Sequence, residues 1–112
     1  MKLPHADRAE VDIRKLRDYC LSDAHPVGKH KAAVFQTALG LNAAHADLLK
    51  GYLLRAAKTM EAITDIADDY GARFRIDFDL VTDAGSAVVR SAWIVQNDED
   101  IPRLVTCFIL PR

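Results

Sequence analysis

The chain has 112 residues, of which 28% are charged, and its formal net charge is −1 at pH 7. This length is typical of one domain, and the near-neutral charge argues against a general binder of polyanions. No apolar run approaches the ~18 residues that a membrane-spanning helix needs. Charges also stand near the N-terminus, where a secretion signal carries its apolar stretch. Two cysteines form no disulfide framework and favour a reducing, cytoplasmic location.

Apolar residues recur at helical spacing in the first half of the chain and at strand spacing in the second. No linker separates the halves, and no repeat or low-complexity stretch interrupts them. The sequence therefore predicts one α+β domain over residues 1–112, helical to about residue 59 and sheet-forming from about residue 60. The expected architecture is three N-terminal helices packed on a four-stranded antiparallel sheet.

Three helices are expected in the first half. Asp12 caps the first, or Asp7 with Glu10 caps it one turn earlier. Gly40 stands where a left-handed residue ends the second, and Asn42 is a favourable N-cap for the third. The expected helices cover residues 12–21, 29–39 and about 43–60.

Four strands are expected in the second half. Ile63 and Ile66 belong to a short first strand, and Pro102 marks the entry to the last. Residues 73–80 alternate between apolar and charged side chains, which predicts one buried face and one salt-bridged, solvated face. Residues 82–85 form a hairpin turn into a strand over residues 86–96. Because residues 104–110 are nearly all apolar, we expect that strand to be central and covered on both faces.

The segment from His25 to Lys31 carries the strongest sign of a binding site. Lys29, His30 and Lys31 occupy the first helical turn, where acidic residues are usual because of the helix dipole. A bound phosphate would favour this arrangement, and His30 could then exchange a proton near neutral pH. His25 could serve as the partner of His30. The alternative is a solvated basic turn with a loop histidine of no consequence.

Polar residues in two apolar strands form a second candidate group. Arg90 interrupts one strand and must reach water, a carboxylate or a bound anion. Arg90 could stabilise a phosphorane transition state, while Ser91 or Thr106 holds a phosphate oxygen. The alternative is an edge arginine with two internally bonded hydroxyls. Cys20 and Cys107 are expected to be core thiols. No metal-ligand spacing, dinucleotide fingerprint or Walker loop occurs, so we expect neither metal nor cofactor.

The sequence resembles a small, uncharacterised bacterial family, a domain of unknown function, over nearly its whole length. The family itself implies no established activity. The matching segments are Lys2-Leu3-Pro4 with Ala6-Asp7, Lys15-Leu16 with Tyr19 and Leu21, His25-Pro26 with Gly28, His30-Lys31-Ala32 with Phe35, Leu39-Gly40, Tyr70-Gly71, Val89-Arg90-Ser91-Ala92-Trp93-Ile94-Val95 and Pro102-Arg103-Leu104-Val105-Thr106.

The layout also resembles the ribonuclease toxin fold of barnase, EndoU, colicin tRNases and RelE. This resemblance implies metal-independent RNA cleavage by a histidine or lysine from the helical half and by arginine, serine or threonine from the strands. The corresponding residues here are His30, Lys31, Arg90, Ser91 and Thr106, with Lys29 and Lys31 holding phosphate. Such a toxin implies RNA as substrate and a small neutralising protein as partner. The chain is less basic than toxins of this type.

Two hypotheses follow. One is a metal-independent endoribonuclease of bacterial toxin type, with a cleft where His30 meets Arg90. The other is a non-catalytic protein-interaction module, such as the immunity or antitoxin partner of a toxin, whose acidic stretches contact a basic protein. Neither hypothesis includes a membrane as a partner.

Overall fold

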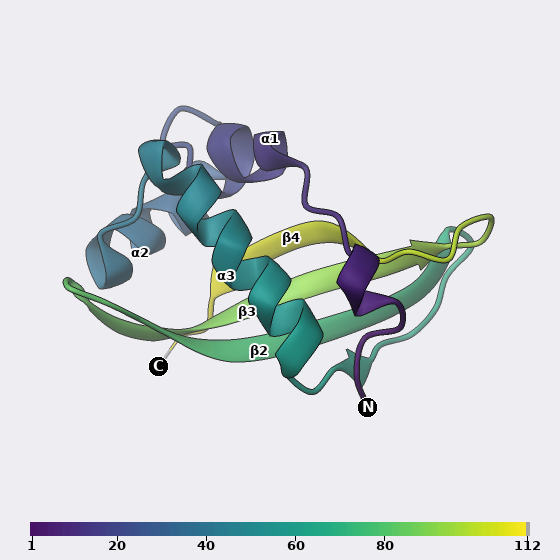
Figure 1. Cartoon of the computed structure of the whole chain (residues 1–112). Helices are drawn as coiled ribbons and strands as arrows, with labels where there is room; N and C mark the ends of the chain where they lie inside the picture. The colour runs from purple at the N-terminus through teal and green to yellow at the C-terminus, as the bar shows by residue number, and fades with distance from the viewer. Residues whose placement is uncertain (112) are drawn as a thin grey trace.

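The computed structural model describes residues 1–111, so the predicted domain end at Arg112 lies outside the described residues. The predicted α+β architecture is confirmed: the helical half packs on one face of an antiparallel sheet with strand order β1-β2-β3-β4 (Figure 1). No helix of residues 1–111 is long and apolar enough to cross a membrane. The elements are η1 (Ala6–Arg8), α1 (Ile13–Lys15), η2 (Leu16–Cys20), α2 (Lys29–Leu39), η3 (Ala43–His45), α3 (Ala46–Thr59), β1 (Ile63–Thr64), β2 (Gly71–Thr82), β3 (Gly85–Gln96) and β4 (Arg103–Ile109).

The helix boundaries follow local signals in the sequence. Asp12 caps α1 by accepting a hydrogen bond from the Arg14 N–H, so the first of the two predicted caps is the one used. Helix α2 spans the predicted residues and ends at Gly40, whose φ of 67° is left-handed. The Asn42 side chain caps the next helical segment as predicted, and the His45 ring closes a capping box with it.

The first helix differs from the prediction in its winding. It is α-helical only over Ile13–Lys15 and continues as a π-helical turn over Leu16–Cys20. The wider π turn is a common feature of functional sites. Tyr19 and Cys20, which belong to the site described below, lie in this turn.

The prediction that the last strand is central was wrong, because β4 is an edge strand. Its apolar character has another cause: segments of the helical half cover its outer side. Glu10 bonds along the start of β4, through its N–H to the Pro102 carbonyl and its carbonyl to the Leu104 N–H. Further along, Cys20 of η2 lies against β4, with its sulfur 3.7 Å from Thr106 Oγ1. Strand β4 is thus shielded without a strand beside it.

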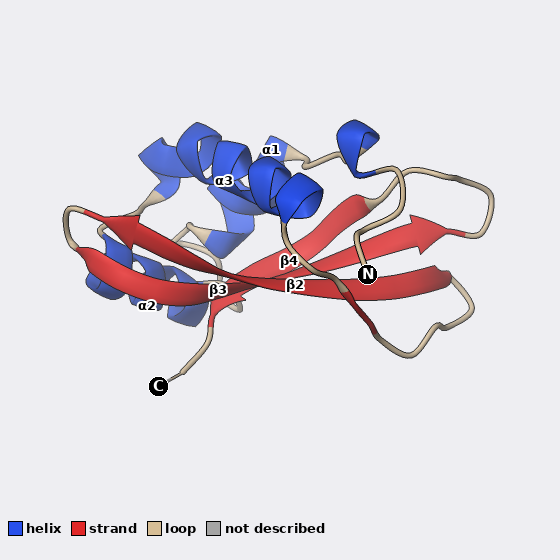
Figure 2. Cartoon of the chain, turned by 60° about the horizontal axis from the view of Figure 1, so that its bottom comes forward, coloured by secondary structure: helices blue, strands red, loops and turns tan. Residues whose placement is uncertain are grey.

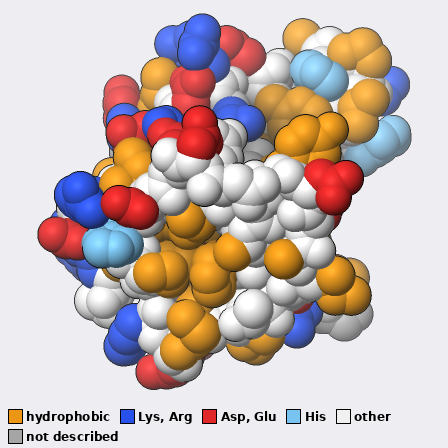
Figure 3. All heavy atoms as spheres, turned by 90° about the vertical axis from the view of Figure 1, so that its right-hand side faces the viewer, with side chains coloured by type: hydrophobic (Ala, Val, Ile, Leu, Met, Phe, Trp, Pro, Cys, Tyr) orange, Lys and Arg blue, Asp and Glu red, His pale blue; other side chains and the backbone are white. Residues whose placement is uncertain are grey.

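The first predicted strand is shorter than expected. Strand β1 comprises Ile63–Thr64 alone, and Ile66 lies beyond it with 92% of its surface exposed. Tyr70, in the same connection to β2, is 72% exposed. Figure 3 views the end of the molecule where this connection lies and shows hydrophobic side chains gathered there.

The two faces of the sheet have opposite character. The face under the helices holds the core, which includes the fully buried Trp93 and Ile76. Figure 2 shows α3 along the sheet and α2 beside the tip of the long hairpin β2–β3, where Thr82 donates a hydrogen bond to the Leu39 carbonyl. The other face carries ion pairs of Arg90 with Asp77, Arg73 with Asp68 and Arg75 with Asp65, which confirms the predicted salt-bridged face.

Candidate functional site

Lys31 is the centre of the most unusual polar arrangement in the fold. Its side chain leaves the first turn of α2, and its Nζ lies 3.4 Å from Thr106 Oγ1 in β4. The same Nζ lies 5.3 Å from the ring centroid of Tyr19 and 5.1 Å from that of Phe108. Both distances are within cation–π range. Lys31 is therefore held by a hydroxyl and an aromatic ring from β4 and by a second aromatic ring from η2.

A β-bulge in β4 brings Thr106 to this position. Trp93 pairs with Leu104 and Ala92 pairs with Thr106, so Val105 is the extra residue on β4. Bulges locally bend and twist a strand and so turn the next side chain. Thr106 consequently lies at the edge of the sheet, within reach of α2.

Cys20 contacts the Thr106 hydroxyl from within the core. Cys20 Sγ lies 3.7 Å from Thr106 Oγ1, and the sulfur is fully buried. Hydrogen bonding from the Cys107 thiol is the largest influence on Cys20 and lowers its pKa to about 6, against the opposing effect of burial. The pKa of Cys107 is raised by its contact with Cys20 and by burial. Because Lys31 donates to the Thr106 oxygen, the Thr106 hydroxyl proton is free to point at the Cys20 sulfur.

An open depression of about 730 Å³ lies in front of Lys31 and Thr106. Its two carboxylates are already paired, Asp12 with Arg14 and Asp18 with Arg17. Within residues 1–111, Lys15 and Lys31 have no ion-pair partner. The depression therefore offers unneutralised positive charge together with hydroxyl and aromatic groups. The full lining is Asp12, Arg14, Lys15, Asp18, Tyr19, His25, Lys31, Val105 and Thr106.

His25 lies in this lining but is held by the backbone. Its Nδ1 accepts hydrogen bonds from the Val27 and Gly28 N–H groups, each at 3.0 Å. Its ring also meets Tyr19 edge to face, with centroids 4.7 Å apart. Two donors on Nδ1 place the proton of the neutral ring on Nε2. His25 thus fixes the loop before α2 and the orientation of Tyr19.

The structure brings together only part of the predicted site. Lys31 and Thr106 meet, whereas Lys29 and His30 are exposed, and within residues 1–111 neither of these two side chains forms a hydrogen bond or ion pair. Successive helical residues lie about 100° apart around the axis, so His30 points away from the face on which Lys31 stands one turn before the buried Phe35.

Arg90 and Ser91 have partners within the fold. Arg90 forms two hydrogen bonds to Asp77, at 2.8 and 2.9 Å, on the open face of the sheet. This pairing lowers the pKa of Asp77. Ser91 is fully buried under the helices, where its hydroxyl donates to the Ile76 carbonyl and accepts from the Trp93 ring N–H, each at 2.9 Å.

Sequence reasoning missed the parts played by Tyr19 and Phe108 and assigned Cys20 to the core alone. Cys20 and Phe108 stand in apolar patterns, which indicate burial and not a neighbouring lysine. Their proximity depends on the packing of η2 against β4, and 86 residues separate Cys20 from Thr106. No local spacing encodes that contact.

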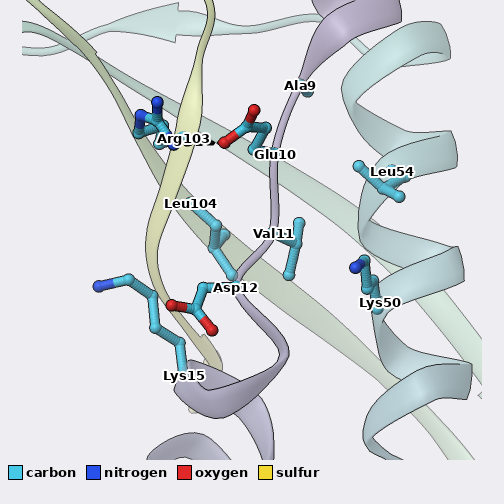
Figure 4. Close-up of a pocket in the computed structure, with 9 residues that line it drawn as sticks. All are labelled: Ala9, Glu10, Val11, Asp12, Lys15, Lys50, Leu54, Arg103 and Leu104. Carbon is cyan, nitrogen blue, oxygen red and sulfur yellow. Dashed lines mark hydrogen bonds and ion pairs between the residues drawn. The ribbon is translucent and has the colours of Figure 1, made fainter.

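A second depression, of about 620 Å³, lies between the N-terminal segment, α3 and the start of β4. Figure 4 shows Lys50 and Leu54 reaching toward it from α3, while Glu10 points at Arg103. That ion pair occupies Glu10, and a second carboxylate, Glu99, also binds Arg103. No group of three or more metal-ligating side chains occurs within residues 1–111.

The comparisons with known proteins place the chain in a family. The profile of a family described as Domain of unknown function (DUF6883) matches residues 2–111. The chain belongs to this family. The predicted resemblance to a small uncharacterised family is thereby confirmed, and the matched residues include all those of the depression around Lys31.

A solved structure shares the fold of this DUF6883 domain. One chain of a contact-dependent growth inhibition toxin–immunity protein complex from Klebsiella pneumoniae 342 aligns with a TM-score of 0.63 and 18% sequence identity. The alignment covers 89% of the DUF6883 chain and 98% of the other. No curated protein matches the sequence. At this identity the likeness establishes a common fold, and the chemistry must be argued from the site.

Proposed function

We propose that this DUF6883 domain is a metal-independent endoribonuclease of a bacterial toxin system, acting on RNA in the cytoplasm at the Lys31–Thr106 depression. The observation that carries the proposal is the environment of Lys31. Its ammonium group lies 3.4 Å from the Thr106 hydroxyl, next to two aromatic rings, and has no carboxylate partner within residues 1–111. The similarity of the fold to a chain of a toxin–immunity complex supports the toxin setting.

A phosphodiester fits this arrangement chemically. Lys31 Nζ and the Thr106 hydroxyl would bind non-bridging oxygens of the scissile phosphate, and the Tyr19 ring would stack on a neighbouring base. The 2′-hydroxyl attacks phosphorus, the bond to the 5′-oxygen breaks, and a 2′,3′-cyclic phosphate results. Lys31 would stabilise the negative charge that develops on the phosphorane.

Proton transfer is assigned to His30 in this proposal. Histidine is the side chain suited to accept the 2′-hydroxyl proton and to protonate the leaving oxygen near neutral pH. His30 precedes Lys31 in the first turn of α2 and is exposed, so the proposal requires its ring to reach the 2′-hydroxyl of RNA whose phosphate is bound at Lys31. The proposal leaves Arg90 and Ser91 in the structural roles that their hydrogen bonds describe.

The test is cleavage of total bacterial RNA in EDTA by the wild type and by two charge-matched variants. We expect Lys31→Met to slow cleavage by about 100-fold or more, the usual cost of removing one group that stabilises a transition-state anion. Lys29→Met removes the same charge from the same helical turn, where the side chain is exposed, and should retain most activity. Equal activity of Lys31→Met and the wild type would contradict the site, and a requirement for added metal would contradict the mechanism.

The alternative is the non-catalytic module, an immunity or antitoxin partner of a toxin. The complex with the similar fold contains both a toxin and an immunity protein, so the similarity is compatible with a toxin function and with an immunity function. The same experiment separates them. RNA left intact by folded wild-type protein would favour the module, and cleavage that depends on Lys31 would exclude it and leave the small protein as the partner that neutralises this domain.

A further inference from the structure

The outer edge of β2 lacks a neighbouring strand along much of its length. Strand β1 pairs with β2 only at Phe74 and Arg75, and the rest of β2 continues to Thr82. Figure 1 shows this stretch with no ribbon beside it on its outer side. The opposite edge of the sheet is β4, so the free edge lies across the sheet from Lys31.

The register identifies the free backbone groups. The Arg73 carbonyl faces outward, because it accepts from the Asp65 N–H beyond the edge. Outward and inward residues alternate along an antiparallel strand, so Asp77, Asp79 and Val81 also face outward. Within residues 1–111, none of these three residues donates or accepts a main-chain hydrogen bond on that side. Three N–H and three C=O groups are therefore available in strand geometry.

A groove of about 440 Å³ follows this free edge, between β2 and α3. Tyr52 and Arg55 of α3 and Met60, which follows the helix, contribute to its wall, and Met60 is 39% exposed. On the other face of the sheet, Asp79 is exposed and has no ion pair within residues 1–111, and Val81 is 68% exposed. One side of an added strand would thus meet an apolar groove and the other side a free carboxylate.

We propose that this edge binds a β-strand of a partner protein in which apolar residues alternate with lysine or arginine. The main-chain groups require an extended segment, because only a strand satisfies alternate N–H and C=O groups along an edge. The apolar residues would enter the groove beside α3, and a basic residue would lie next to Asp79. This proposal is independent of RNA cleavage.

A second copy of the chain fits the edge less well. An antiparallel pair that uses all three outward residues places Asp79 opposite Asp79 of the other copy. Like charges directly opposite each other destabilise paired strands. The unpaired carboxylate of Asp79 therefore favours a basic residue of a partner strand over self-association.

The test uses a capped seven-residue peptide of alternating valine and lysine, with amide hydrogen exchange as the readout. In the free protein, the amides of Asp77, Asp79 and Val81 should exchange quickly, and those of Ile76 and Phe78 slowly. At a peptide concentration about ten times Kd, the three outward amides should exchange about tenfold more slowly, since exchange occurs from the unbound fraction. Outward amides that are protected without peptide, or unprotected by millimolar peptide, would overturn the proposal.

Two variants test the chemistry of recognition. Val81→Pro removes an N–H that has no partner in the fold, which proline tolerates on an edge strand, and should abolish peptide protection while the inward amides stay slow. Asp79→Lys should reverse the preference, so that the matching valine–glutamate peptide binds better than the valine–lysine peptide. Unchanged preference would overturn the assignment of a basic partner, as would protection that rises with protein concentration alone, which indicates a second copy. RNA cleavage does not enter these readouts, so this proposal and the nuclease proposal fail separately.

Discussion

Replacing Ser91 with alanine separates a structural role from a catalytic one. The Ser91 hydroxyl is fully buried, accepts a hydrogen bond from the Trp93 ring N–H and donates one to the Ile76 carbonyl. Ser91→Ala leaves the indole N–H without an acceptor inside the core. An unsatisfied buried donor costs about 1–3 kcal/mol, so we expect the free energy of unfolding to fall by about 2 kcal/mol. For a chain of this length, each 1 kcal/mol lowers Tm by about 4 °C, and the expected shift is about 8 °C.

The assay is urea unfolding followed by far-UV circular dichroism, with a double-mutant cycle as control. Trp93→Phe removes the ring N–H itself, so adding Ser91→Ala in that background should cost about 1 kcal/mol less than in the wild type. RNA cleavage by Ser91→Ala, measured well below its Tm, should stay within about threefold of the wild type if the hydroxyl does not touch substrate. An equal stability loss in both backgrounds would refute the hydrogen-bond explanation. A large loss of activity with unchanged stability would return Ser91 to the catalytic site.

Two further predictions concern the packing around the site. The pKa of Cys20, lowered to about 6 by the Cys107 thiol, predicts thiolate absorbance at 240 nm that rises through pH 6 and moves to higher pH in Cys107→Ala. The unfolded thiol keeps its proton up to about pH 9, so between pH 6 and pH 9 the folded chain binds fewer protons than the unfolded chain. The free energy of unfolding should therefore increase with pH from 6 to 9. A free energy of unfolding that does not change over this range would contradict the assignment. Gly28→Ala places a Cβ 2.5 Å from the Tyr19 carbonyl and should destabilise the fold by about 1–3 kcal/mol. Gly51→Ala adds a Cβ that meets nothing within 4 Å in α3 and should stabilise the fold by about 0.5–1 kcal/mol. Shifts of the urea midpoint in the same direction for both variants would refute the steric argument.

The features predicted correctly are those that neighbouring residues determine. Gly40 ends α2 because a left-handed residue is needed within one turn of the helix end, and the N–H of Leu41 bonds back to Phe35. Strand β2 was predictable because one face of it is buried and the other is wet. In each case the signal lies within about six residues of the structure it predicts.

The features that were missed depend on contacts between distant segments. The apolar pattern of β4 indicates burial without saying whether a strand or a helix provides it, and here η2 and α2 do so at an edge. The contact of Lys31 with Thr106 needs both that packing and the bulge at Val105. The sequence pattern placed the two residues in separate groups, the resemblance to ribonuclease toxins assigned both to one site, and the fold shows the contact itself.

The most direct test of the central claim is a crystal structure with a 2′-deoxy dinucleotide, which lacks the attacking hydroxyl and is not cleaved. We expect its phosphate to lie within hydrogen-bond distance of Lys31 Nζ and Thr106 Oγ1, with a base against the Tyr19 ring. A phosphate bound instead at Arg90 on the open face of the sheet, with the Lys31 depression empty, would contradict the account.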